Sequence, residues 1–153
     1  EENFELLYGI GKCIAEQFGP NCEVVLHDLT KPYENTIVAI WNGHVTGRKL
    51  GDGGTDAGLK ILKGTAQPED TYNYINSTRN GQILRSSSKY LKDKEGRVVG
   101  SMCINFDITE ILKGQDDRIK DQINKLKEQD DRLKEQDQVI RELMKKIEQL
   151  ENK

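Results

Sequence analysis

The chain has 153 residues, and 32% of them are charged against 35% that are hydrophobic, a poor ratio for one compact globule. All nine aromatic residues and 13 of the 14 glycines precede residue 110. Neither residues 1–109, with 12 basic and 14 acidic side chains, nor residues 110–153, with 11 and 12, have the basic excess that nucleic-acid binding requires. We therefore predict a globular domain at 1–109, a separate segment at 110–153, and no nucleic-acid binding by this chain alone.

Three cysteines, Cys13, Cys22 and Cys103, lie in or beside apolar segments, and their number is odd. Free thiols of this kind are typical of a reducing compartment, so we expect a cytoplasmic protein. No apolar run approaches the ~18 residues that a membrane span needs, and we expect no membrane partner.

The first predicted element is an amphipathic helix over 4–18, because apolar residues recur at three- and four-residue steps as far as a Gly-Pro pair. Short apolar runs predict strands at 23–27 and 36–41. Five glycines between 43 and 54 predict a loop with almost no regular structure. The next residues, 55–62, are predicted to form a short helix with a polar cap.

Three further strands are predicted at 71–75, 82–91 and 97–106, the last two joined as a hairpin. Because no long crossover helix separates them, we expect an antiparallel sheet with helices on one side, an α+β fold. The last strand alternates between an apolar core face and a small, mixed face that suits the wall of a cavity or a helix contact. The apolar face holds Val98, Met102, Ile104 and Phe106, and the mixed face holds Val99, Ser101, Cys103 and Asn105.

Three separated segments, 18–28 (FGPNCEVVLHD), 40–48 (IWNGHVTGR) and 100–107 (GSMCINFD), resemble the YheO-like PAS domain, and the resemblance covers most of 4–109. It implies a PAS-like fold, a five-stranded antiparallel sheet flanked by short helices that can enclose a small ligand. That domain is the N-terminal half of a family of bacterial transcriptional regulators that includes the D-arginine-utilisation repressor. The helix-turn-helix half of those regulators is not found in this chain, so DNA binding is not carried over.

Family members carry an apolar pair with proline where this chain has two glycines at 53–54, which predicts a less constrained loop. The Asp-Ile-Thr sequence at 107–109 resembles the motif that often ends a PAS domain and begins a signalling helix. Asp107 and Thr109 are thus predicted to form a signal junction. Asp107 is expected to cap the helix, with Glu110 completing an acidic capping box.

An apolar residue recurs every seven positions through 110–153, which predicts a coiled-coil helix. If this series occupied d, then Asp116, Asp130 and Asp137 would be buried at a, which is costly for unpaired charges. The series is therefore assigned to a, with glutamine or leucine at d. The apolar oligomerisation residues are Leu112, Ile119, Leu126, Leu133, Ile140, Leu143, Ile147 and Leu150.

In this register, charges at g and e pair between parallel neighbours, for example Lys125 with Asp130 and Arg132 with Asp137. Isoleucine at a with leucine at d near the C-terminus favours a parallel homodimer, and four glutamine layers leave a trimer open. Whether the coil is native or an added clamp also stays open.

A small ligand cavity is predicted where the glycine-rich loop meets the short helix and the last strands. An arginine at this place suits a carboxylate ligand. The alternative is that the same residues only form turns, caps and ion pairs. The candidate ligand-binding residues are Asn42, His44, Thr46, Arg48, Thr55, Asp56, Arg85, Cys103 and Asn105.

The sequence contains no recognisable catalytic or metal-binding pattern. His27, His44 and the cysteines lack metal-ligand spacing, and no orienting triad accompanies the serines at 86–88. We therefore predict a non-enzyme without a metal, and the sequence indicates no cofactor. The leading hypothesis is a sensory, regulatory module of a bacterial transcriptional regulator that binds a small polar metabolite or a partner and oligomerises. The alternative is a structural oligomerisation protein whose domain holds no ligand.

Overall fold

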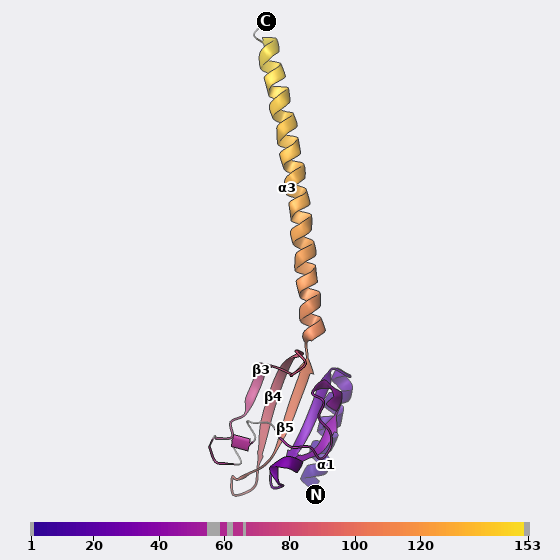
Figure 1. Ribbon diagram of the computed structural model, residues 1–153, viewed down its shortest axis with the longest axis vertical. Coiled ribbons are helices and arrows are strands. Elements are labelled where there is room, and N and C mark those ends of the chain that lie inside the picture. The colour runs from indigo at the N-terminus through magenta and orange to yellow at the C-terminus, as the bar shows by residue number, and fades with distance from the viewer. Residues whose placement is uncertain (1, 55–58, 61–62, 66, 152–153) are drawn as a thin grey trace. The chain divides into compact units, whose positions relative to one another are not determined.

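A computed structural model of the chain describes residues 2–54, 59–60, 63–65 and 67–151 (Figure 1). The chain divides into two compact units, Glu1–Thr109 and Glu110–Lys153. The first unit contains both helices and strands, and the described part of the second unit is one helix. Each unit is described by itself below.

The first unit is built on a five-stranded sheet with the strand order β2-β1-β5-β4-β3, in which every neighbouring pair is antiparallel. This confirms the predicted α+β fold. The elements are α1 (Glu2–Phe18), β1 (Cys22–Asp28), the 3-10 helix η1 (Tyr33–Asn35), β2 (Ile37–Trp41), the 3-10 helix η2 (Gly43–Val45), β3 (Thr71–Ser77), β4 (Ile83–Lys92), β5 (Val98–Asp107) and α3 (Thr109–Glu151).

One face of the sheet carries the apolar core. α1 lies against β1 and β2 on this face (Figure 1), where Ala15, Cys22 and Val24 are buried. Gly11 permits this approach, because a Cβ atom there would lie 2.6 Å from the ring of Trp41. The partly buried apolar side chains packed around this cluster are Ile14, Trp41, Met102, Ile104 and Phe106.

The other face of the sheet is mostly polar, although it includes Val25 and Leu84, and much of it is buried. Side chains alternate along each strand, so the residues that point away from α1 belong to this face. On β5 they are Ser101, Cys103 and Asn105, in agreement with the predicted mixed face. Buried polar residues on this face come from three neighbouring strands: Glu23, His27, Ser86, Ser88, Ser101 and Asn105.

The glycine-rich loop after β2 is more ordered than its composition predicts. It begins with η2, and further on Gly51 donates to the Ile37 carbonyl at 3.0 Å while Ile37 donates to the Asp52 carbonyl at 3.0 Å. A Cβ atom on Gly53 would lie 2.7 Å from the Tyr33 carbonyl oxygen. The glycine at 53 thus allows the loop to pack closely against η1.

The predicted helix at 55–62 falls mostly outside the described residues, since 55–58 and 61–62 are not described. Thr55 and Asp56, two of the candidate ligand-binding residues, belong to that part of the chain. Leu59 and Lys60 are helical.

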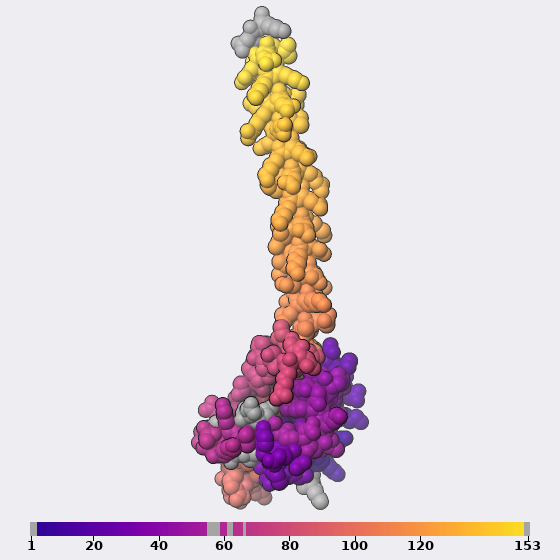
Figure 2. Space-filling model, in the orientation of Figure 1, coloured from indigo at the N-terminus to yellow at the C-terminus, as the bar shows by residue number. Residues whose placement is uncertain are grey.

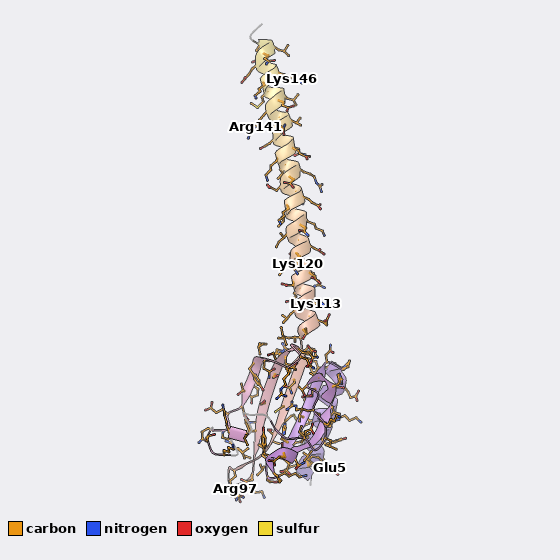
Figure 3. The ribbon with its side chains drawn as sticks, viewed as in Figure 1. Glu5, Arg97, Lys113, Lys120, Arg141 and Lys146 are labelled. Carbon is orange, nitrogen blue, oxygen red and sulfur yellow. The ribbon has the colours of Figure 1, made fainter. Side chains whose placement is uncertain are left out.

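α3 is a single helix of 43 residues, and none of its described side chains is buried. Figure 2 shows one face of this helix, with side chains standing out along its described length. The apolar residues of the predicted seam are exposed, from 39% at Leu112 to 70% at Leu150. Ion pairs within the helix, such as Lys134 with Asp130 at 2.5 Å, lie along the helix surface, and other charged side chains project outward (Figure 3). Within the described residues, no helix is long and apolar enough to cross a membrane.

Candidate functional site

A cavity of about 920 Å³ lies over the polar face of the sheet. This volume is within the range of small-molecule sites, roughly 300–1,000 Å³. Its walls come from β1, the loop that contains η2, β3, the β3–β4 turn, β4 and β5. Polar lining residues include His27, His44, Thr46, Arg48, Tyr74, Thr78, Gln82, Ser88, Ser101, Cys103 and Asn105.

The centre of the site is a buried carboxylate, Glu23, whose side chain has no exposed surface. Arg48 Nη2 donates to Glu23 Oε1 at 2.7 Å, and Asn105 Nδ2 donates to the same oxygen at 2.9 Å. Thr46 Oγ1 donates to Glu23 Oε2 at 2.5 Å. A buried charge needs both a counter-ion and hydrogen bonds, and Glu23 has both.

The Arg48 guanidinium is held in one orientation by two of its three nitrogens. Its Nε donates to Thr46 Oγ1 at 2.9 Å, and its Nη2 donates to Glu23. Its third nitrogen, Nη1, is buried and has no hydrogen-bond partner among the described residues. A buried donor without an acceptor costs about 1–3 kcal/mol. The arrangement therefore places a fixed cation at the wall of the cavity, and one of its nitrogens has no acceptor among the described residues.

Asn105 connects the carboxylate to the neighbouring strand β4. Ser86 Oγ donates to Asn105 Oδ1 at 2.8 Å, which leaves the amide nitrogen of Asn105 directed at Glu23. Beside this pair, Ser88 Oγ donates to Cys103 Sγ at 3.4 Å, and the Tyr74 hydroxyl lies 3.0 Å from Ser88 Oγ. The floor of the cavity thus carries two hydrogen-bonded sets of neutral polar groups, one of which surrounds the ion pair.

His27 forms a neutral part of the wall. Burial, and secondarily the positive charge of Arg48, lower the pKa of His27 to about 4. Its Nδ1 lies 3.0 Å from Thr36 Oγ1, a residue that is itself buried. At neutral pH the imidazole is therefore uncharged, and the positive charge on this side of the cavity comes from Arg48.

Five of the nine candidate ligand-binding residues line the cavity: His44, Thr46, Arg48, Cys103 and Asn105. The prediction is wrong for Asn42, which has φ of 54° and donates through Nδ2 to the carbonyls of Gly19 at 3.1 Å and Cys22 at 2.8 Å. Asn42 therefore ties the turn after β2 to the end of α1, as the alternative interpretation expects.

Arg85 is also outside the cavity. It pairs with Phe106 across β4 and β5, so it lies on the same face as the apolar core, and its side chain is exposed. The neighbours of Arg85 in the chain, Leu84 and Ser86, take the cavity face. Consecutive residues of a strand point to opposite faces of the sheet, so Arg85 lies on the face away from the cavity.

The sequence reasoning missed Glu23, the residue that organises the site. A signal was present, because Glu23 is the one charged residue within the otherwise apolar run Cys22-Glu23-Val24-Val25-Leu26. A charge inside a continuously apolar strand is buried unless the strand lies at a surface, and a buried charge requires a partner. That partner is Arg48, which lies 25 residues further along the chain, so the fold decides which residue pairs with Glu23.

The junction at the end of β5 has the predicted cap with one difference. Asp107 Oδ1 accepts hydrogen bonds from the Thr109 backbone nitrogen at 3.0 Å and from Thr109 Oγ1 at 2.6 Å. The expected return bond from Glu110 is wrong, because the Asp107 backbone nitrogen donates to the Asn21 carbonyl at 2.8 Å. The cap therefore consists of Asp107 and Thr109, and the backbone of Asp107 is hydrogen-bonded to the segment before β1.

Comparison of the sequence with known families matches residues 1–120 to the YheO-like PAS domain. The chain belongs to this family. Relatives include YheO of Escherichia coli K12, 31% identical over 97 residues that cover 62% of this chain and 40% of YheO. The transcriptional regulator DauR of Pseudomonas aeruginosa is 31% identical over 110 residues, covering 71% of this chain and 49% of DauR. The chain spans about half the length, or less, of these relatives.

Solved structures with similar folds include an RNA-binding light-oxygen-voltage receptor, with a TM-score of 0.45 and 17% identity over 78% of this chain and 38% of the receptor. A PAS domain of the fruit-fly ELK potassium channel has a TM-score of 0.41 and 21% identity, over 64% of this chain and 96% of the domain.

Among the described residues, no three His, Cys, Asp or Glu side chains are grouped as metal ligands.

Proposed function

We propose that this chain is the sensory module of a bacterial transcriptional regulator, and that its cavity binds a small polar metabolite with a carboxylate or similar acceptor group. The observation that carries the proposal is the Arg48 guanidinium at the cavity wall, fixed by Glu23 and Thr46 and with Nη1 unpaired within the described residues. Arginine recognises planar acceptor groups through paired N–H donors, so a ligand oxygen is the natural partner for the spare donor.

The fixed polar groups of the cavity, which share its wall with apolar residues such as Leu29, Val45 and Leu84, support a small ligand that carries polar groups. His27 is neutral at physiological pH, and serine, threonine and asparagine side chains surround the ion pair. Ligand sites of this kind use a few fixed polar groups to orient the ligand. The relatives support the regulatory role, since DauR is a transcriptional regulator. A cytoplasmic location, without an enzymatic activity, a membrane partner or nucleic-acid binding by this chain alone, belongs to the same proposal.

Oligomerisation through α3 is the second half of the proposal. The apolar side chains at a and d are exposed on an isolated helix, and pairing of parallel copies buries them. A parallel homodimer agrees with the isoleucine and leucine layers near the C-terminus, and a trimer is the competing state. A structural protein that oligomerises through α3 and binds no ligand is the alternative function.

The ligand half is tested by native mass spectrometry of the purified chain, followed by calorimetric titration with a panel of amino acids, hydroxy acids and dicarboxylates. Arg48→Lys keeps a positive charge beside Glu23 but removes the spare donor, and it is expected to weaken binding about ten-fold or more. Arg85→Lys is the matched control, because Arg85 is exposed on the other face. If neither purified nor titrated protein holds a ligand while the chain still oligomerises, the structural alternative is correct.

A further inference from the structure

The short turn between β3 and β4 has two separate sets of contacts. The first set forms the turn and faces the cavity. Thr78 donates from its backbone nitrogen to the Gln82 carbonyl at 3.0 Å, and the Gln82 backbone nitrogen donates to Thr78 Oγ1 at 3.1 Å. Residues 78–80 and Gln82 are among those that line the cavity. The turn is therefore part of the cavity wall.

The second set of contacts holds the end of β5. Gln82 Nε2 donates to Asp107 Oδ2 at 2.9 Å. The next residue, Ile83, donates from its backbone nitrogen to Thr109 Oγ1 at 2.9 Å and accepts from the Ile108 backbone nitrogen at 2.9 Å. All three residues of the Asp-Ile-Thr junction are thus bonded to Gln82 or Ile83.

We propose that the β3–β4 turn couples the cavity to the start of α3, with Gln82 as the positioning residue. This inference rests on the proposed ligand-binding function and names the route by which occupancy of the cavity is read. The Gln82 side chain is half-buried, lines the cavity and donates to the carboxylate that caps α3. One side chain therefore belongs to both the ligand site and the junction.

The physical basis is competition for one amide group. Asp107 uses Oδ1 for Thr109 and Oδ2 for Gln82, so each oxygen has a donor from a different part of the chain. An acceptor in the cavity that attracts Gln82 Nε2 removes a donor from Asp107 and loosens the junction. A ligand shifts the junction only as far as it binds the two arrangements unequally. The difference in ligand affinity between the two arrangements comes from Gln82 Nε2, which donates either to Asp107 or to the ligand.

The first test measures hydrogen exchange of the Ile83, Ile108 and Thr109 amides in the full chain. Gln82→Ala removes the donor to Asp107, and Gln82→Glu replaces it with a like charge. We expect exchange of these amides to become about five-fold faster in Gln82→Ala, and faster still in Gln82→Glu. The matched controls are Asn80→Ala and Asn80→Asp, which change the same turn and the same cavity wall. Equal exchange in the Gln82 and Asn80 variants overturns the inference.

The second test fills the cavity without a natural ligand. Iodoacetamide in the Cys13→Ser background alkylates Cys103, which lines the cavity: the thiolate displaces iodide, an S–C bond forms, and the thiol proton passes to the buffer. Cys22 is buried, and burial and the neighbouring Glu23 raise the pKa of its thiol, which protects it from the reagent. The label places a carboxamide among the polar groups of the wall.

We expect the label to change exchange of the Ile108 and Thr109 amides at least two-fold in the otherwise native chain, and to lose this effect in Gln82→Ala. A label effect of the same size with and without Gln82 overturns the inference, and so does an absence of any effect at a fully labelled Cys103. Failure of Cys103 to react means that the cavity wall is closed to small molecules, which also overturns it. Because this test uses a covalent group, a failed search for the natural ligand does not affect its outcome.

Discussion

The two units of this chain use charged residues in opposite ways. In the first unit, Glu23 is buried without exposed surface and is compensated by Arg48, Thr46 and Asn105. In α3, charged side chains are exposed, and pairs such as Arg132 with Glu128 lie on the surface at 3.8 Å. Buried ion pairs are costly to break, while exposed pairs contribute little. A single substitution is therefore expected to matter greatly in the first unit, whereas α3 depends on the sum of many layers.

The largest expected effect concerns α3 as a whole. A chain that ends at Thr109 lacks every residue of the apolar seam, so we expect it to move to a smaller species in light scattering. A milder version in the full chain, Leu143→Gln with Ile147→Gln, removes two apolar layers and is expected to weaken the assembly. Lys145→Gln, at an outer position of the same helical turn, is the control. Retention of the full stoichiometry by the shortened chain would show that the first unit supplies the main interface.

The next effect concerns the buried ion pair. Arg48→Ala leaves the Glu23 carboxylate buried without its counter-ion, and we expect it to lower the free energy of unfolding of the first unit by about 3–5 kcal/mol. Urea denaturation, monitored by the fluorescence of Trp41, measures this change in the free energy of unfolding. Arg85→Ala removes an exposed arginine from the same unit and is expected to change stability by less than about 0.5 kcal/mol. Similar losses of unfolding free energy from both substitutions would mean that the Glu23 ion pair stabilises the first unit no more than an exposed arginine does.

A smaller effect is expected from pH. The pKa of His27 falls from its ordinary value near 6.5 to about 4 in the folded state, so the unfolded chain binds the proton more tightly. The His27 contribution is fully present above about pH 6.5 and is lost as the pH falls toward 4, in total about 3 kcal/mol. His27→Gln should flatten the measured dependence of unfolding free energy on pH in this window.

His44 provides the control for that measurement, because the chain has only two histidines and His44 is exposed. His44→Gln should leave the slope between pH 6.5 and pH 4 unchanged. If both histidine variants keep the slope of the native chain, carboxylates and not His27 cause the acid sensitivity of the first unit.

The smallest expected effect is at the junction. Asp107→Ala removes the acceptor for Thr109 and costs about 1 kcal/mol of helix capping. The first turns of α3 contain Gly114 and Gln115, and we expect them to be marginally stable because glycine costs roughly 1 kcal/mol in a helix interior. We expect faster hydrogen exchange at 110–120 with the heptads beyond Ile140 unchanged. Equal loss of protection along all of α3, or none, would show that Asp107 does not govern the junction.

Sequence reasoning was most successful where structure depends on local repeats. The strands of the first unit follow from short apolar runs and alternating patterns, and the helix through 110–151 follows from a seven-residue apolar repeat, which a chain shows without knowledge of its fold. Five candidate residues in the cavity were also identified, because they lie on a turn-rich loop and on the mixed face of one strand. The errors at Asn42 and Arg85 came from a turn contact and from strand parity, which neighbouring residues alone do not reveal.

Composition and periodicity by themselves determined that the chain has two units, that the first is a five-stranded α+β domain, and that the second is a helix with a heptad seam. Tertiary structure alone decided which polar groups meet. Glu23 finds Arg48 and Gln82 finds Asp107, each across 25 residues of chain. The loop that contains η2 packs against β1 and brings Arg48 to Glu23, and the pairing of β4 with β5 brings Gln82 to Asp107. Hydrogen bonds act over about 3 Å, so their partners depend on the register of the strands, which is a property of the packed sheet and not of any one segment.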